Sequence, residues 1–276
     1  MFRLIESTDF QVTPFPHLVK DDFMEPHDYS ALMSELKEIE KAKRRVWSGD
    51  SDKVVNPTEW VKDSENAENY PMAKSVMEYF SSKNFYTPLI NEWSKYFPSR
   101  LKITSDNITN RVSELSNCGL KFDAAGDFVK IRDPHIDAPT NIMVWLFYCR
   151  LPEDSSKGGD LTLFSFKRGF RGFRIDNLVD ARHLPARDIK LERTVEFKTN
   201  RLVAFMNGRD SIHGITDRHY GNVSRVKFHG GLASDDVRLE TSLENSPIWK
   251  LFYHPLKIAQ RVLIRVKTTF GGRANY

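Results

Sequence analysis

Two residues with metal-ligand chemistry, His135 and Asp137, stand two positions apart in the segment DPHIDAP. We expect them at the end of a β-strand, where residues i and i+2 point to the same face. An imidazole nitrogen and a carboxylate oxygen can then bind one cation. We predict His213, in the later segment NGRDSIHGI, as the third ligand, with His219 and His229 as competing histidines. Two histidines and one carboxylate are typical of the facial triad of non-heme iron(II) oxygenases.

The elements that must position these residues are short strands in the second half of the chain. Runs rich in Val, Ile, Phe, Tyr and Thr, separated by Gly, Pro, Asn and Asp, are typical of strands and turns. The predicted strands are Asp127–Ile131, Asn141–Tyr148, Asp160–Phe166, Arg201–Phe205 and Arg225–Leu232. Strands without intervening helices favour an antiparallel sandwich or barrel over a parallel sheet.

The first part of the chain has helical periodicity instead. Apolar residues recur at helical spacing after a candidate cap at Asp28. Two more amphipathic helices are predicted over residues 68–80 and 86–97. The sequence therefore predicts one domain, in which an N-terminal helical layer packs on a β-sandwich and a C-terminal tail follows.

Composition excludes several classes of protein. The chain has 276 residues, of which 40% are hydrophobic and 28% charged, as in ordinary globular proteins. Its two cysteines, Cys118 and Cys149, cannot form a disulfide framework or a four-cysteine zinc site. The first residues lack the apolar core of a secretory signal, so we expect a cytoplasmic protein. A net charge of +4 does not predict nucleic-acid binding.

Six segments in one order carry a resemblance to a known family. They are TPFPHLVKDDFMEPHDYSALMSEL, HIDAP, NIMVWLFYCRLPED, GGDLTLF, NRLVAFMNGRDSIHGI and SRVKFHGGL. Together they resemble the iron(II)- and 2-oxoglutarate-dependent dioxygenases, in particular the prolyl-4-hydroxylase-like branch, over roughly residues 14–234. The resemblance implies Fe(II), 2-oxoglutarate and O2 as the reacting partners, and hydroxylation of an unactivated C–H bond with release of succinate and CO2.

The resemblance also implies an α+β fold with a double-stranded β-helix, or jelly-roll, core. We expect an oxygenase domain over residues 1–235, with the helical layer at 1–121 and the jelly-roll core at 122–235. A basic C-terminal extension with a helix is expected at 236–276.

For the far carboxylate of 2-oxoglutarate the resemblance implies Arg225, with Tyr148 as a hydroxyl donor. A guanidinium group matches a carboxylate with two parallel hydrogen bonds. Strand alternation places Arg225 and Lys227 on one face, so Lys227 stays a rival. The separation between His213 and Arg225 is longer than is usual in the branch, which leaves Arg218 as a second rival.

Two segments are strongly basic. Residues 167–193 contain eight basic and four acidic residues, which predicts either a lid that favours an anionic substrate or a solvated loop. Residues 247–276 contain six basic residues and no acidic one. Their pattern after Pro255 is that of a basic amphipathic helix. We favour packing of this helix on the domain over peripheral contact with an anionic membrane.

Two functions from other classes stay open. A cupin-type metal enzyme would use a similar metal cage without 2-oxoglutarate, and a non-catalytic jelly-roll module would only bind a ligand. The substrate of an oxygenase is open as well: a small molecule or a peptide, with anionic character favoured by the basic segment at 167–193.

Overall fold

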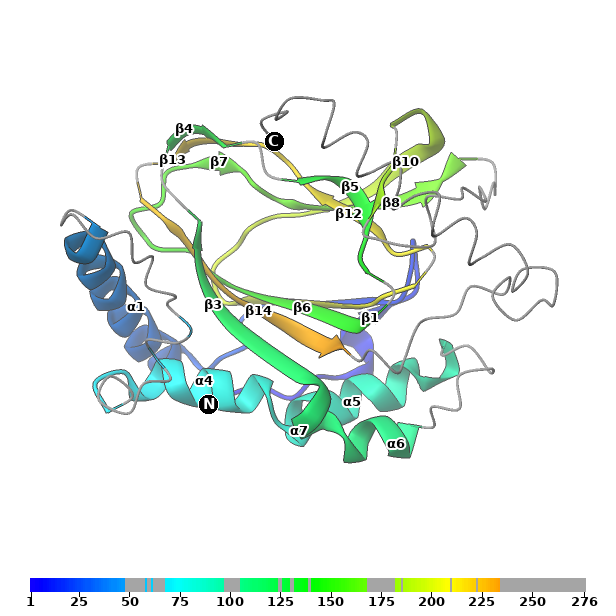
Figure 1. Ribbon diagram of the computed structural model, residues 1–276, viewed down its shortest axis with the longest axis horizontal. Helices are drawn as coiled ribbons and strands as arrows, with labels where there is room; N and C mark the ends of the chain where they lie inside the picture. Colours follow the sequence, from blue (N-terminus) through cyan, green and yellow to red (C-terminus); the bar gives the residue numbers. More distant parts are fainter. Residues whose placement is uncertain are drawn as a thin grey trace, which may run out of the picture.

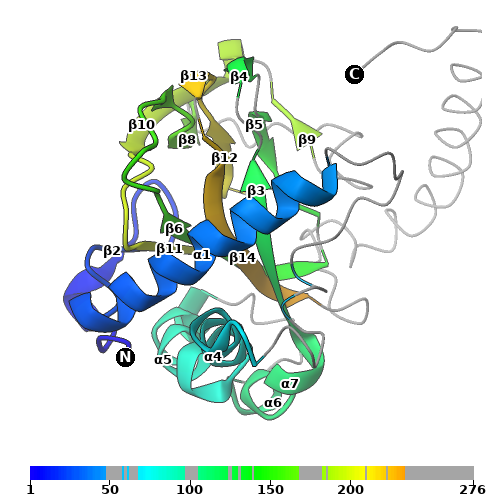
Figure 2. The same cartoon turned by 90° about the vertical axis from the view of Figure 1, so that its left-hand side faces the viewer.

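Three layers build the described part of the molecule: helices, a six-stranded sheet and a five-stranded sheet (Figures 1 and 2). The computed structural model describes residues 1–47, 58, 61, 68–96, 105–123, 126–129, 132–138, 140–167, 182–184, 186–208, 210–221 and 223–233. The predicted basic extension at 236–276, with its helix, lies outside the described residues. So does most of the basic segment, at 168–181.

The helical layer follows the predicted periodicity. Its helices are α1 (Pro26–Trp47), α4 (Pro71–Phe80), α5 (Lys83–Trp93), α6 (Ser105–Asn110) and α7 (Val112–Leu115), with 3-10 turns η1 (Ser7–Asp9) and η2 (Ser94–Tyr96). The apolar stripe of α1, including Leu32, Leu36 and Ile39, is fully buried. Asp28 is not the cap that the sequence suggested, because α1 already begins at Pro26, a residue favoured at a first helical position. Within the described residues, no helix is both long and apolar enough to cross a bilayer.

All strand pairings among the described residues are antiparallel. The six-stranded sheet contains, in order, β1 (Phe10–Gln11), β2 (His17–Lys20), β11 (Arg201–Met206), β6 (Asn141–Cys149), β14 (Arg225–Ala233) and β3 (Ser116–Asp123). The five-stranded sheet contains β10 (Ile189–Val195), β8 (Leu161–Phe166), β12 (Ile212–Ile215), β5 (Arg132–Ile136) and β9 (Arg182–His183). A small sheet of β4 (Gly126–Val129), β13 (Arg218–Gly221) and β7 (Lys157–Gly158) completes the fold.

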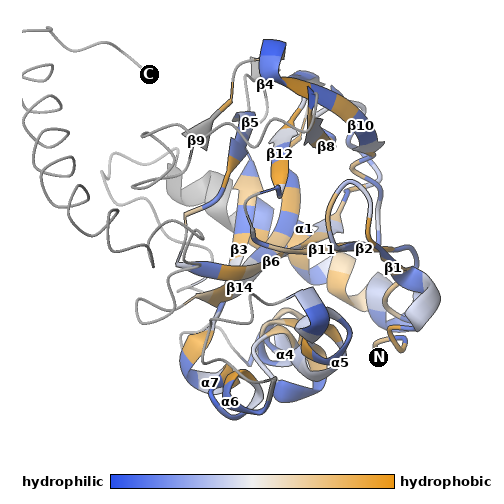
Figure 3. Cartoon of the chain, turned by 90° about the vertical axis from the view of Figure 1, so that its right-hand side faces the viewer, coloured by the Kyte–Doolittle hydropathy of each residue, from blue (hydrophilic) through white to orange (hydrophobic). Residues whose placement is uncertain are grey.

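The six-stranded sheet buries a different set of side chains on each face. From β6, Met143, Trp145 and Phe147 belong to the large core shared with the helices. The alternate residues Val144, Leu146 and Tyr148 belong to a second cluster. That cluster also contains Leu161 and Leu163 of β8 and Val195 of β10, so it lies between the two sheets. This period-2 pattern follows from strand geometry. Figure 3 shows apolar residues, in orange, on strands of both sheets.

The first 121 residues, which were expected to form the helical layer, also contribute three strands. Strands β1 and β2 join the six-stranded sheet beside β11, and β3 begins at Ser116 beside β14. The basic segment at 167–193 likewise contributes β9 and most of β10. These short or charged strands are held by hydrogen bonds to distant partners, which local composition does not reveal.

A buried hydrogen-bond chain fastens the helices to the six-stranded sheet. Trp145 Nε1 donates to the Tyr86 hydroxyl at 2.8 Å, and that hydroxyl donates to the Gly231 carbonyl at 3.0 Å. Phe80 of α4 stacks on the Trp145 ring, with ring centroids 4.1 Å apart. Tyr86 of α5 thus joins two neighbouring strands, β6 and β14.

We expect Tyr86→Phe to lower the free energy of unfolding by about 1–3 kcal/mol, because it leaves the buried Trp145 N–H without its acceptor. Urea denaturation measures the change. Tyr79→Phe is the matched control, since the Tyr79 hydroxyl has no hydrogen bond to any described residue and its removal should change stability little. Equal effects of the two substitutions would contradict this role of Tyr86.

Candidate functional site

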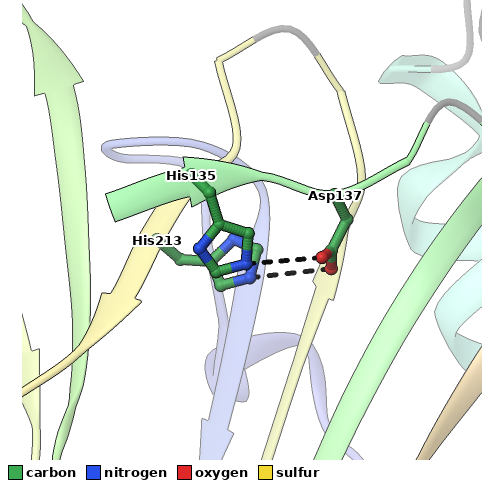
Figure 4. A group of neighbouring side chains, drawn as sticks. All are labelled: His135, Asp137 and His213. Atoms are coloured by element: carbon green, nitrogen blue, oxygen red, sulfur yellow. Dashed lines mark ion pairs between the residues drawn. The ribbon is translucent and has the colours of Figure 1, made fainter. Parts of the chain in front are cut away.

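The structure brings His135, Asp137 and His213 together between the two large sheets (Figure 4). His135 of β5 and His213 of β12 are direct cross-strand partners, and their ring centroids lie 4.3 Å apart. Asp137 follows one residue after the end of β5 and shares a face with His135, as the i, i+2 spacing predicted. The three ligand atoms all lie within 4.8 Å of one another.

Backbone carbonyls fix the orientation of both imidazoles. His135 Nδ1 lies 2.8 Å from the Asp133 carbonyl, and His213 Nδ1 lies 2.9 Å from the Ser211 carbonyl. A carbonyl only accepts, so each Nδ1 carries a hydrogen and each Nε2 points the other way, towards Asp137. Histidines that bind metals commonly make this second hydrogen bond.

The donor atoms suit a divalent cation. His135 Nε2 lies 3.4 Å from one Asp137 carboxylate oxygen, and His213 Nε2 lies 3.6 Å from the other. A cation about 2.1 Å from each ligand places neighbouring ligands about 3 Å apart, close to these separations. A cation among these atoms can accept a lone pair from each of the three side chains. The residues therefore fit a metal ion of the kind that the facial triad holds.

The competing histidines lie elsewhere. His219 is exposed on β13, in the small sheet, and His229 is exposed on β14. Of the metal-ligating residue types in the described part of the chain, the group that gathers at one point is His135, Asp137 and His213.

Arg225 lies in a second buried polar cluster on the inner face of the six-stranded sheet. Its neighbours Val226 and Phe228 face the helical core, so Arg225 and Lys227 face the other sheet. Arg225 Nε donates to Asp154 Oδ2 and to Ser156 Oγ, each at 3.1 Å. Burial lowers the pKa of Arg225, and Asp154 opposes that shift.

The other two basic candidates are also buried, and each has its own acceptors. Arg218 is 0% exposed and donates to Ser156 Oγ at 3.0 Å and to the Val223 carbonyl at 2.6 Å. Lys227 donates to Asp123 Oδ2 at 2.6 Å. Burial lowers the pKa of Lys227, and Asp123 acts against it.

The Gly158–Gly159 turn wraps around the Arg225 guanidinium. Both glycines have positive φ angles, 71° and 70°, which other residues rarely adopt. The Gly158 carbonyl accepts from Arg225 Nη1 at 2.5 Å. A Cβ on Gly159 would lie 2.3 Å from the same nitrogen. The close approach of the arginine therefore leaves no room for a side chain at Gly159.

Tyr148 shares an aromatic partner with Arg225. The Phe197 ring stacks on Tyr148 at 4.4 Å, and the Arg225 guanidinium carbon lies 4.5 Å from the centre of the same ring. Tyr148 is 2% exposed, and its hydroxyl has no hydrogen bond to any residue that the structure describes. Burial, and to a smaller extent Asp160, raises the pKa of Tyr148, so the hydroxyl keeps its hydrogen.

Asp154, Ser156 and Phe197 were not predicted from the sequence. Asp154 is fully buried among arginines, yet its segment PEDSS has the composition of a surface turn. The available signal was a carboxylate just before the Gly-Gly turn, together with two later arginines that require a partner. Local patterns do not reveal such long-range pairing.

Comparison with known proteins gives structural likeness only. No protein-family model matches the sequence, and no curated protein matches it. A prolyl 4-hydroxylase from Phytophthora capsici is 16% identical, with 88% of this chain and 68% of that chain covered and a TM-score of 0.46. A Pseudomonas putida prolyl-4-hydroxylase is 15% identical, with 79% and 86% covered and a TM-score of 0.34.

A third solved structure is a prolyl hydroxylase from Trichoplax adhaerens in complex with a hypoxia inducible factor peptide fragment. It is 12% identical, with 80% of this chain and 85% of that chain covered and a TM-score of 0.38. All three similar structures are prolyl hydroxylases, at low sequence identity.

We expect His213→Ala to weaken Co(II) binding by about 100-fold or more, because it removes one of three converging ligands. Isothermal titration of metal-free protein with Co(II) measures the affinity. His219→Ala is the control and should bind Co(II) as the unmodified protein does. Retained binding in His213→Ala, with loss in His219→Ala or His229→Ala, would assign the third ligand to another histidine.

Proposed function

We propose that the protein is an iron(II)- and 2-oxoglutarate-dependent dioxygenase that hydroxylates an unactivated C–H bond, with release of succinate and CO2. The observation that carries the proposal is the His135–Asp137–His213 triad, which faces the space between two antiparallel sheets. Arg225 and Tyr148 face the same space from the six-stranded sheet.

The triad would hold Fe(II) through the Nε2 atoms of both histidines and a carboxylate oxygen of Asp137. Iron bound in this way supplies the redox chemistry that couples oxidation of 2-oxoglutarate by O2 to hydroxylation of the substrate. The chain itself keeps the ligand set rigid: Asp133 and Ser211 carbonyls hold the imidazoles, and Phe205 packs 4.6 Å from the His213 ring.

Arg225 and Tyr148 are suited to bind the far carboxylate of 2-oxoglutarate. Each terminal nitrogen of a guanidinium carries two hydrogens. Among the described residues, Nη1 donates to Gly158 and Nη2 to Ser156, so each retains one hydrogen for a further acceptor. A carboxylate can accept both in the two-point geometry that arginine favours. The Tyr148 hydroxyl adds a third donor.

The distance between the two ends of the proposed site is compatible with this ligand. Phe205, beside His213, pairs with Val144 of β6, and Tyr148 lies four residues further along that strand. At about 3.3 Å per residue, Val144 and Tyr148 are about 13 Å apart along β6. In the proposal, the diacid and the side chains that bind its two ends lie along this stretch of β6.

Charge supports the same ligand. A divalent cation beside Asp137 leaves one net positive charge. At the other end, Arg218 and Arg225 both approach the buried carboxylate of Asp154. Arg150 also approaches Asp154, but it is partly exposed and lies 3.9 Å from Glu196. 2-Oxoglutarate carries one negative charge at each end and would neutralise both positions.

Lys227 and Arg218 are weaker choices for this role. The Lys227 ammonium already has the Asp123 carboxylate at 2.6 Å, which the exposed Lys121 also approaches, at 3.3 Å. Arg218 is enclosed by Ser156, the Asp123 and Val223 carbonyls, and Asp154. We therefore assign the carboxylate to Arg225 and treat Arg218 as the residue that shares Asp154 with it.

The topology fits the fold that such enzymes use. In chain order, β3, β6, β11 and β14 lie in the six-stranded sheet, and β5, β8, β10 and β12 lie in the five-stranded sheet. We propose that these eight strands form a double-stranded β-helix with the triad at one end. The substrate, in this proposal, is a small molecule or a peptide that reaches that end.

Binding of 2-oxoglutarate tests the function against the cupin-type and non-catalytic alternatives. Calorimetric titration of 2-oxoglutarate into Mn(II)-loaded protein should show one site, with much weaker binding to metal-free protein. A cupin-type enzyme would bind the metal but not 2-oxoglutarate. A non-catalytic module would not show binding of 2-oxoglutarate that depends on the metal. Release of succinate in the presence of candidate substrates then identifies the substrate.

We expect Tyr148→Phe to raise the dissociation constant of 2-oxoglutarate by about tenfold or more, because it removes one hydrogen bond to a charged group. Arg225→Ala should raise it further, by at least about 30-fold. Tyr79→Phe, on the helical side of the six-stranded sheet, is the control and should have no effect. If Lys227→Met weakens binding while Tyr148→Phe and Arg225→Ala do not, Lys227 takes the role instead.

A further inference from the structure

The side chain of Asn207 forms hydrogen bonds next to two residues of the proposed metal site, Asp137 and His213. It directly follows β11, is 1% exposed, and begins the turn that leads to His213 on β12. We propose that Asn207 is a positioning residue that holds Asp137 and His213 in one geometry through a single side-chain amide. This inference rests on the proposed metal site and names a residue that acts on it without contacting the metal.

The nitrogen of the Asn207 amide holds the segment that follows Asp137. Asn207 Nδ2 donates to the Ala138 carbonyl at 2.9 Å and to the Asn141 carbonyl at 2.8 Å. Ala138 is the residue immediately after Asp137, and its carbonyl also accepts from Asn141 N at 2.9 Å. The backbone N–H of Asn207 donates to the Ile142 carbonyl at 3.0 Å. The turn that carries the Asp137 carboxylate is therefore fixed to Asn207.

The oxygen of the same amide holds the segment that precedes His213. Asn207 Oδ1 lies 3.0 Å from Ser211 Oγ, and Ser211 is 1% exposed. Ser211 Oγ also accepts from Gly208 N at 2.9 Å and lies 2.7 Å from the Gly208 carbonyl, which closes the turn. The Ser211 carbonyl is the group that fixes His213 Nδ1 as a donor.

An asparagine is chemically suited to this position. Its planar amide offers two hydrogens on one side and an acceptor on the other. Aspartate could accept from Ser211 but would repel the Ala138 and Asn141 carbonyls, and alanine would leave both carbonyls without their donor. The pairing of β5 with β12 is short and irregular. The Asn207 amide therefore adds a direct link between the end of β5, next to Asp137, and the start of β12, next to His213.

Three variants and two measurements test the proposal. Asn207→Ala removes the amide, and Ser211→Ala removes only the hydroxyl link and keeps the carbonyl that orients His213. Asn200→Ala is the matched control: its buried amide bonds both the N–H and the carbonyl of Met24 at 2.9 Å, away from the triad. Asn200 has a φ of 54°, so alanine there adds backbone strain and should destabilise the fold at least as much.

The first measurement is the dissociation constant for Co(II), by calorimetry. The second is the tautomer of His135 and His213 in the metal-free protein, by long-range ¹H–¹⁵N correlation spectra. We expect Asn207→Ala to weaken Co(II) binding by about 10- to 100-fold, and Ser211→Ala by about tenfold. In both variants the His213 signals should shift from the pure Nδ1–H pattern towards a mixture, while Asn200→Ala keeps the affinity and the pattern of the unmodified protein.

The outcomes separate this proposal from the proposed function. If the unmodified protein shows the Nδ1–H tautomer and Asn207→Ala loses it, but neither binds metal, the proposed function fails and the positioning role stands. If Asn207→Ala is destabilised like Asn200→Ala yet keeps the affinity and the tautomer pattern of the unmodified protein, Asn207 only stabilises the fold and the proposal is overturned. Should Asn207→Ala not fold, Ser211→Ala decides in the same way.

Discussion

Convergence of lone pairs at one buried point is the constraint on which the site depends. Two carbonyl groups place the hydrogens of His135 and His213 on Nδ1, which turns both Nε2 atoms towards the Asp137 carboxylate. A cation bound among these atoms can accept a lone pair from each of the three side chains. The antiparallel pairing of β5 with β12, together with the turn at Asn207, holds the side chains in this arrangement.

Side chains alternate along β14, so the strand buries apolar residues on one face and places charged residues on the other. On β14, Val226 and Phe228 enter the helical core, and Arg225 is left to face the five-stranded sheet. Burying a guanidinium is costly unless it is paired. Asp154 provides that pair, and Arg218 approaches the same carboxylate. In the function that we propose, a metal ion at the triad and Arg225 at the other end bind a molecule with two negative ends.

Local rules predicted the parts of the site that are close in sequence. His135 and Asp137 follow from the i, i+2 rule, and the inward direction of Arg225 follows from its apolar neighbours. His213 was preferred to His219 by the order of motifs, and the structure places it opposite His135. Asp154, Phe197 and Asn207 could not be predicted, since each matters through partners far along the chain. For the same reason β2 and β10 were missed, because their hydrogen bonds come from β11 and β8.

A crystal structure of the protein loaded anaerobically with Fe(II) and 2-oxoglutarate tests the central claim most directly. The account predicts one anomalous iron peak bound by His135 Nε2, His213 Nε2 and the Asp137 carboxylate. It also predicts 2-oxoglutarate with its far carboxylate on Arg225 and the Tyr148 hydroxyl. An iron peak at other residues, or iron at the triad with no 2-oxoglutarate at Arg225 under saturating conditions, would contradict it.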